Sequence, residues 1–281
     1  MSERDKNSRL FTDLIRDASD WFGNWTPNQT IEVGDYGTVN RETGVFEKEG
    51  SIYDQEFSPV LHEDIMRNHG IHLCQPEDQV IVVSRGCKSQ AFTTDFSHAH
   101  PEIVGSNIKG RWSFSRGRGA IVVLHRPTEK IIQGKERLFP RPEFTEALEG
   151  KALVTGVYTC PRYAQLLTDS AAWRANAAIG LRFMDVAGAS MSGTWHHYST
   201  SGVWRSGGQE GGLTFHPLYT LKTPKPKGWL ERMLNRRGDL EQEPSEDTFI
   251  TYQPPWDVLD DDGNETTPES PLKDEDETLD F

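Results

Sequence analysis

The segment DFSHAHPE, residues 95–102, holds side chains that could bind a metal ion. His98 and His100 are two positions apart, so on a strand both rings would lie on one face, and Asp95 is close in sequence. Imidazole and carboxylate groups are common ligands of zinc, and such a site would suit a metal-dependent enzyme. A third ligand is not identifiable at a suitable spacing. We therefore expect ordinary loop histidines and predict no metal site.

Sequence patterns for catalysis and for cofactor binding are missing elsewhere in the chain. There is no GxGxxG after a strand, no GxxxxGK[ST], no GxSxG and no HExxH. His196 and His197 would point to opposite faces of a strand and cannot chelate one ion together. Cys160 has no base predicted near it, and the three cysteines form neither a CxxC pair nor a disulfide framework. We predict that the protein is not an enzyme and uses no cofactor.

A basic turn, RGRG at residues 116–119, follows two aromatic side chains. Trp112 and Phe114 could stack on bases while the arginines contact phosphates, as in proteins that bind single-stranded nucleic acid. The chain has a net charge of −13, which would repel a polyanion. We therefore predict no nucleic-acid partner.

The negative charge is concentrated near the C-terminus. Residues 239–281 contain sixteen acidic side chains and one lysine, which leaves residues 1–238 slightly basic at +2. A tail of this composition commonly serves solubility. Residues 248–259, TFITYQPPWDVL, carry large apolar side chains that a solvating tail does not need, and burying each one is worth roughly 1.5–3 kcal/mol. We predict that this segment docks on the body, and that residues 260–281 form a disordered end.

The spacing of apolar residues predicts the secondary structure. A helix is expected at residues 7–22, ending at Gly23, with a short second helix within 59–70. Residues 108–115 and 120–125 read as one long hairpin with RGRG at its tip. Further strands are expected on both sides of the turn at 40–44 and at 79–84, 152–160, 177–183, 187–204 and 213–222. The predicted fold class is α+β: a twisted, mainly antiparallel sheet with an N-terminal amphipathic helix and packed helices, then a short acidic C-terminal tail.

Two features bear on membranes. The chain has no run of 18 apolar residues and no apolar segment near its start, so we expect neither a transmembrane helix nor a secretory signal. Residues 186–204 contain no charged side chain and alternate small with moderately apolar residues, a weak pattern typical of strands that cross a bilayer. An ordinary core hairpin would explain the same pattern.

The order of these elements resembles that of a gasdermin pore-forming domain. The segments DWFGNWTPNQTIEVGDYGTVNRETGVFEKEGSIYD and CPRYAQLLTDS are similar to fungal gasdermin-like proteins, which execute cell death in heterokaryon incompatibility, and the resemblance covers about residues 8–225. It implies a pore-forming domain at 1–230, a basic-to-acidic linker with a cleavage site at 231–247, and an autoinhibitory tail at 248–281.

The resemblance also implies a mechanism. The protein would be cytoplasmic while inactive, and a protease, expected to be a serine protease, would remove the tail. The pore-forming domain would then bind acidic phospholipids of the plasma membrane, self-oligomerise and extend two hairpins per subunit, at about 105–126 and 177–204, into a transmembrane β-barrel. Closing the strands into a barrel would satisfy every strand edge within the lipid.

The resemblance and the charge pattern together give candidate site residues. The lipid-binding candidates from the resemblance are Arg9, Arg16, Lys109, Arg111, Arg116 and Arg118, and charge alone adds Lys222, Lys225 and Lys227. The expected cleavage region contains Arg236, Arg237, Gly238, Asp239 and Leu240. The expected autoinhibitory anchors are Phe249, Tyr252, Trp256 and Leu259. Two other functions stay open: a soluble protein- or ligand-binding module with an acidic assembly tail, and a metal-dependent enzyme that uses His98 and His100.

Overall fold

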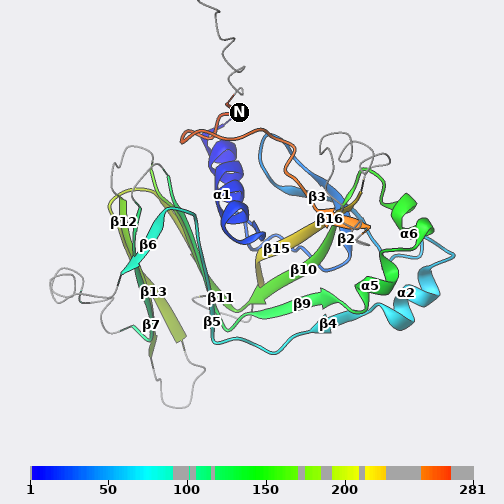
Figure 1. Cartoon of the computed structure of the whole chain (residues 1–281). Helices are drawn as coiled ribbons and strands as arrows, with labels where there is room; N and C mark the ends of the chain where they lie inside the picture. Colours follow the sequence, from blue (N-terminus) through cyan, green and yellow to red (C-terminus); the bar gives the residue numbers. More distant parts are fainter. Residues whose placement is uncertain are drawn as a thin grey trace, which may run out of the picture.

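The computed structural model describes residues 2–90, 101, 106–114, 118–169, 175–184, 192–208, 213–225 and 248–266 (Figure 1). Its helices are α1 (Glu3–Ser19), α2 (His62–Asn68), α5 (Lys135–Leu138) and α6 (Pro142–Ala147). Its strands are β1 (Phe22–Gly23), β2 (Asp35–Val39), β3 (Phe46–Ser51), β4 (Ile71–Leu73), β5 (Gln79–Val83), β6 (Cys87–Gln90), β7 (Ile108–Phe114), β8 (Ala120–His125), β9 (Thr128–Ile132), β10 (Ala152–Cys160), β11 (Arg162–Leu167), β12 (Ala175–Met184), β13 (Ser192–Ser199), β14 (Val203–Gly207), β15 (Phe215–Pro224) and β16 (Phe249–Thr251). The α+β prediction, with antiparallel sheets and an N-terminal helix, is confirmed.

The first helix lies three to four residues earlier than its apolar pattern predicts. Ser2 and Asp5 form a capping box that starts the helix at Glu3. Asp20 takes a left-handed conformation with φ of 62° and ends it. Phe22 and Gly23, which continue the apolar pattern, pair instead with β15 as a short strand. In the described part of the chain, none of the helices has the length and apolarity needed to span a bilayer.

The largest sheet, here called sheet A, is built around β10. This strand pairs with β15 along one edge, and with β2 and then β9 along the other. Strands β1 and β16 extend the sheet beside β15, while β3 pairs with β2 and β4 with β9. A core that includes Phe46, Phe144, Leu153 and Tyr219 packs sheet A against the short helices.

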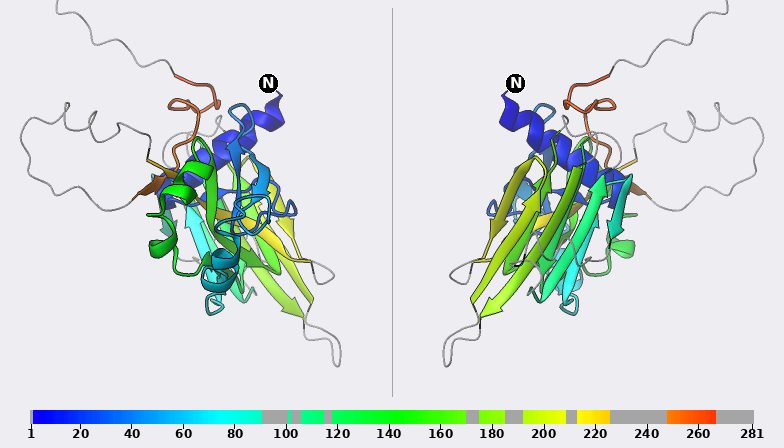
Figure 2. Two further views of the ribbon diagram at one scale, coloured as in Figure 1. Left: turned by 90° about the vertical axis from the view of Figure 1, so that its right-hand side faces the viewer. Right: turned by 90° about the vertical axis from the view of Figure 1, so that its left-hand side faces the viewer.

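Two smaller sheets form stacked layers beside sheet A. Sheet B has the strand order β14-β11-β8-β5, and sheet C has the order β13-β12-β7-β6. Trp112 and Ile179 of sheet C pack on Ile121 and Leu166 of sheet B. The opposite face of sheet B packs with α1 through a second core that includes Phe11. Sheet C is therefore the outermost layer, seen face-on at the right of Figure 2.

Sheets B and C are made from the same two long hairpins. Residues 79–90 pair with residues 108–125 in both sheets, through β5 with β8 and then β6 with β7. Residues 162–184 pair with residues 192–207 in the same way, through β11 with β14 and β12 with β13. The two hairpins lie side by side, joined by β8 with β11 and β7 with β12. Each hairpin is thus folded over once, with one half in each layer.

The predicted hairpin of residues 108–125 is wrong, because β7 and β8 lie in different sheets. Between these two strands the chain passes from sheet C to sheet B, and of the RGRG segment the structure describes Arg118 and Gly119. Alternation of apolar and polar residues identifies which face of a strand is buried but not which strand it pairs with, and a glycine-rich bend fits a corner as well as a hairpin tip. The predicted strand at 187–204 is wrong in a similar way: its described part contains a break at Gly202, which has φ of 131° and separates β13 from β14.

Candidate functional site

Residues 248–266, here called the strap, lie against the body of the protein. The strap begins with β16, which adds to sheet A by pairing Thr251 with Lys222 of β15. Phe249 is 7% exposed, and its ring stacks on Phe139 with centroids 4.3 Å apart. The backbone N–H of Tyr252 donates to the carbonyl of Leu221 at 3.0 Å. The start of the strap is therefore held by strand pairing and by aromatic packing.

The strap then crosses α1 (Figure 1). Trp256 is 8% exposed and donates from Nε1 to the Asp13 carboxylate at 3.0 Å. Burial raises the pKa of Asp13, which the Trp256 hydrogen bond opposes. Leu259 is partly buried against two of the cores. The four anchor residues expected from the sequence thus all contact the body.

The end of the strap forms a turn, so the disorder predicted from residue 260 onward is wrong as far as residue 266. The Asp260 carboxylate accepts hydrogen bonds from the backbone N–H groups of Asp262 and Asn264, at 2.9 and 2.8 Å. Gly263 closes the turn with φ of 74°. The N–H of Thr266 donates to the carbonyl of Val258 at 2.8 Å. Local side-chain capping orders this segment although it has few apolar residues.

Arg9 of α1 is the centre of the contact with this turn. The arginine is 4% exposed and donates from Nη1 to Glu265 at 3.1 Å and to the carbonyl of Arg41 at 3.0 Å, and from Nη2 to the carbonyl of Gly263. Arg41 also pairs with Glu265, and its hydrogen bond is the main cause that lowers the pKa of Glu265 to about 2. Lys6 donates to Asn264 at 2.8 Å. We call this group of contacts the Arg9 clamp.

The cationic candidates from the sequence fall into three groups. Three bond to the strap through their side chains: Arg9, Arg16, which donates to Gln253 at 3.3 Å, and Lys222, which donates to Thr251 at 2.8 Å. Lys109 and Arg111 lie on β7 in sheet C. Of the remaining two described candidates, Arg118 lies at the corner and donates to Asn7 at 2.7 Å, and Lys225 contacts the strap through its backbone N–H, which donates to the carbonyl of Thr248 at 2.9 Å.

Several predicted residues lie outside the part of the chain that the structure describes. They are the cationic candidates Arg116 and Lys227, the cleavage-region residues Arg236, Arg237, Gly238, Asp239 and Leu240, and the histidines His98 and His100. The described residues include no group of three or more His, Cys, Asp or Glu placed to hold a metal ion. Burial raises the pKa of Cys160 to about 12, which keeps this thiol protonated at neutral pH.

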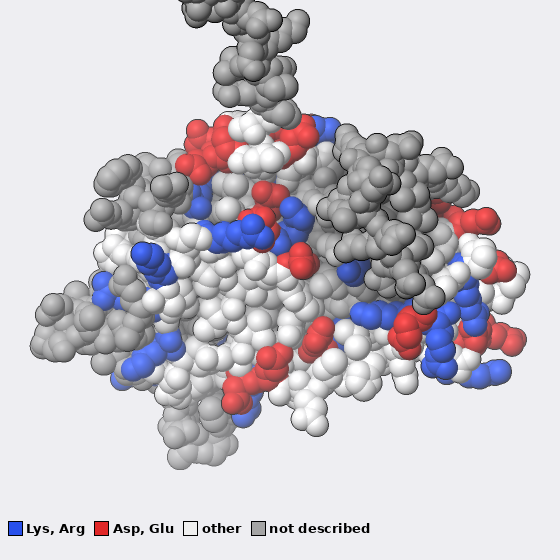
Figure 3. Space-filling model, viewed as in Figure 1, with Lys and Arg blue, Asp and Glu red and all other residues white. Residues whose placement is uncertain are grey.

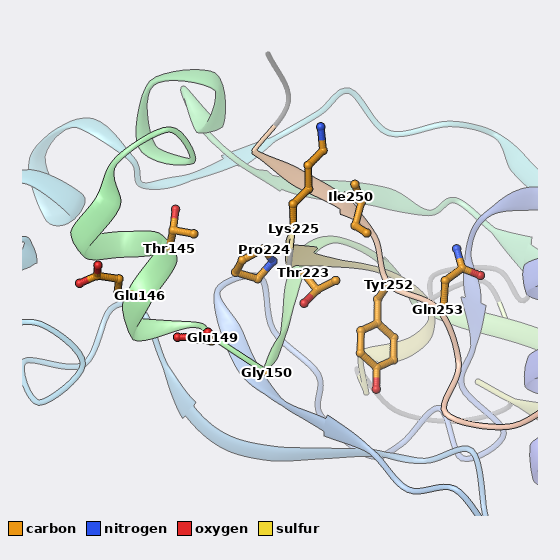
Figure 4. Close-up of a pocket in the computed structure, with 10 residues that line it drawn as sticks. All are labelled: Thr145, Glu146, Glu149, Gly150, Thr223, Pro224, Lys225, Ile250, Tyr252 and Gln253. Carbon is orange, nitrogen blue, oxygen red and sulfur yellow. The ribbon is translucent and has the colours of Figure 1, made fainter. Parts of the chain in front are cut away.

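A cavity of about 640 Å³ lies beside the strap (Figure 4). Thr145 and Glu146 of α6 line one side, Pro224 of β15 lines its floor, and Ile250 and Tyr252 of the strap complete the wall. Because the strap supplies part of the lining, its release would open the cavity.

Charge is distributed unevenly over the described surface. Figure 3 shows acidic side chains gathered at the top, where the end of the strap lies, and basic side chains at the left, over sheet C.

No protein-family model and no curated protein sequence matches the chain. Its function is therefore inferred from the residues, the docked strap and the folded hairpins.

Proposed function

We propose that this chain is a gasdermin-like pore-forming protein that executes regulated cell death and is held inactive by its acidic tail. Proteolysis between residues 236 and 247 would separate the tail from the pore-forming domain. That domain would bind acidic phospholipids of the plasma membrane, oligomerise and insert its two hairpins as a pore.

The observation that carries the proposal is the pair of long hairpins folded into sheets B and C. Strand β12 is 10 residues long, which matches the roughly 9–11 residues that a tilted strand needs to cross a bilayer. The register of the strands replaces the expected hairpin bounds: we now propose residues 79–125 and 162–207 as the hairpins that rearrange. The corners would have to open so that the two halves of each hairpin become continuous.

The two faces of sheet C suit contact with lipid on one side and with water on the other. Trp112, Phe114, Ile179, Leu181 and Trp195 all lie on the face buried against sheet B. The alternate positions of these strands are polar, small or basic. A strand that crosses a bilayer beside a water-filled interior needs this division. The apolar face is covered now and would have to leave sheet B to reach lipid.

The free edges of the two sheets offer a way to self-associate. Within the described residues, β5 and β6 form one edge of the hairpin pair, and β14 and β13 form the other. Pairing of one edge with the opposite edge of a neighbour is a head-to-tail contact, which can close into a ring. This arrangement supports a self-oligomer in the membrane.

The strap supports the regulatory part of the proposal. It covers three cationic candidates, Arg9, Arg16 and Lys222, and carries acidic residues to the surface of α1. Each basic residue near an anionic leaflet gains on the order of 1 kcal/mol. Removal of the tail would expose these cations, and loss of residues 239–281 would change the net charge of the chain from −13 to +2.

Expression in cells tests the proposal and separates it from a second candidate. A chain of residues 1–238 is expected to be toxic, while the full-length chain is tolerated.

The cavity beside the strap favours the second candidate, a ligand-binding module with an acidic assembly tail. In that case both chains would be harmless, and the proposed function would be rejected.

A further inference from the structure

We infer that the pore conducts anions in preference to cations, because the basic face of sheet C lines its water-filled interior. This inference rests on the proposed function and adds the selectivity of the pore to it. The residues that would set the selectivity are Lys88, Lys109, Arg111 and Arg182.

These four bases share one face of sheet C. In β7, Trp112 and Phe114 point into the core between the sheets, so Lys109 and Arg111 lie on the opposite face. In β12, Ile179 and Leu181 point into the same core, which puts Arg182 on that opposite face as well. Lys88 pairs with Ser113, the next position on the outer face of β7, and so joins the group. Lys88, Lys109 and Arg182 are exposed, and Arg111 is half-buried.

The four strands of sheet C contribute no acidic residue to this face. Within β6, β7, β12 and the described strand β13, no position is Asp or Glu. The remaining outer positions are small or neutral: Ala178 pairs with Arg111 and Tyr198, and Gly180 pairs with Lys109 and His196. The four strands therefore place only positive formal charge on the outer face of sheet C at neutral pH.

The orientation of the strands in a membrane follows from the two faces. Lysine and arginine on the lipid face of a strand are costly at the middle of a bilayer, whereas the face with Trp112, Ile179 and Trp195 is apolar. The apolar face must therefore contact lipid, and the basic face must contact the water of the pore. Repetition of the subunit around a ring repeats these cations, and rings of Lys or Arg favour anions in a pore.

The reversal potential of the pore in a planar bilayer tests this inference. The full-length chain, with a recognition site for a chosen protease inserted between residues 236 and 247, is cut in contact with the bilayer under asymmetric potassium chloride. The expected result is a chloride-to-potassium permeability ratio above one. A conducting pore with a ratio below one would overturn the inference while leaving the proposed pore intact. A cut protein that is folded but conducts no current would overturn both.

Charge reversal identifies the residues. The double variant Lys109→Glu with Arg182→Glu is expected to lower the chloride-to-potassium ratio toward or below one. The matched control, Arg67→Glu with Lys135→Glu, changes two exposed bases on α2 and α5 and should leave the ratio at the wild-type value. If the reversed variant does not insert, Lys109→Gln with Arg182→Gln is used, and an intermediate ratio is expected. A conducting variant of either kind with the wild-type ratio would contradict a role of this face in selectivity.

Discussion

Arg9 shows how one buried cation can hold a distant segment of the chain. Its guanidinium is almost fully buried, so its donors need partners, and the strap supplies two of them through Glu265 and Gly263. The third acceptor, the carbonyl of Arg41, belongs to the body. Because the clamp needs both the turn and α1, loss of either side should release the end of the strap.

Arg9→Gln is expected to loosen the strap in the uncut protein. The change removes charge-assisted hydrogen bonds worth about 1.5–3 kcal/mol to the docked state. Limited proteolysis of the strap should become faster, and dye release from anionic vesicles should rise without cleavage. Arg67→Gln, an exposed arginine on α2, serves as the control and should behave as wild type. Unchanged proteolysis of the Arg9 variant would show that the clamp does not hold the strap.

Trp256→Ala tests the central anchor of the strap. Truncating a buried tryptophan costs about 3–5 kcal/mol, and here it also removes the hydrogen bond to Asp13. We expect the uncut variant to be toxic in cells. Val258→Ala changes a neighbouring side chain that is 77% exposed and should have no effect. If Trp256→Ala is as harmless as wild type, the tail inhibits by charge alone or does not inhibit.

The lowered pKa of His125 predicts that the stability of the protein depends on pH. Burial, followed by the charges of Arg162 and Arg126, lowers its pKa from 6.5 to about 4, and its ring packs on Phe183 with centroids 4.8 Å apart. Between pH 6.5 and about 4, His125 is therefore protonated more often in the unfolded chain than in the folded protein. The free energy of unfolding should fall as pH drops from about 6.5 to 4.

The measurement for His125 is urea unfolding across that pH range. His125→Phe keeps an aromatic ring at the site but cannot be protonated, so its unfolding free energy should fall less steeply with acidification than that of wild type. Equal slopes for the two proteins would show that His125 does not titrate between sheets B and C.

Hydrogen bonds at the corners hold the hairpins in their folded-over arrangement. Ser84 accepts from the N–H of Ala120 at 3.0 Å, and Thr168 accepts from the N–H of Gly119 at 2.6 Å. Ser84 is 3% exposed and Thr168 is 1% exposed. The first hydrogen bond joins the two strands of one hairpin at its corner, and the second joins the corners of the two hairpins to each other. Opening of the hairpins would have to break both.

Gly202→Ala should destabilise the folded-over hairpins. The φ of 131° is strained for any other residue, and a Cβ would lie 2.4 Å from the carbonyl oxygen of Leu167. We expect a loss of about 1–3 kcal/mol of unfolding free energy, measured by urea titration. Gly70→Ala is the control: a Cβ there meets nothing within 4 Å, so its stability should change little. Wild-type stability of the Gly202 variant would mean that this corner can relax.

The sequence predicts single elements better than it predicts their partners. The strand at 152–160 is found at those bounds as β10, because its uncharged run, which is rich in β-branched residues, ends at Pro161. The anchors of the strap are predictable because Phe249 and Trp256 are out of place in an acidic tail. The Arg9 clamp is not predictable from the sequence, because Arg9 and Glu265 are 256 residues apart and neither residue is unusual in its own segment. The passage of the chain from β7 in sheet C to β8 in sheet B is missed because a short-range sequence pattern does not distinguish a bend between sheets from a hairpin turn.

The body and the strap pack together as one folded unit, although the body has a small net positive charge and the tail that contains the strap has a large net negative charge. The slightly basic body includes sheet C with its cationic face, while the strap belongs to a tail that carries all of the net negative charge of the chain. The strap contributes a strand to sheet A and anchors to two of the cores. Cleavage between residues 236 and 247 would leave the strap held by non-covalent contacts alone, so membrane binding would have to compete with it.

Dye release from liposomes measures whether removal of the tail lets the protein permeabilise a membrane. The full-length protein and the same protein cut at an engineered site between residues 236 and 247 are compared on vesicles with and without anionic phospholipid. We expect that only the cut protein releases dye, and only from anionic vesicles, because the strap covers Arg9, Arg16 and Lys222 until it is displaced. If the cut protein is folded and has lost its tail but leaves anionic vesicles intact, removal of the tail does not activate pore formation and the proposed function is wrong.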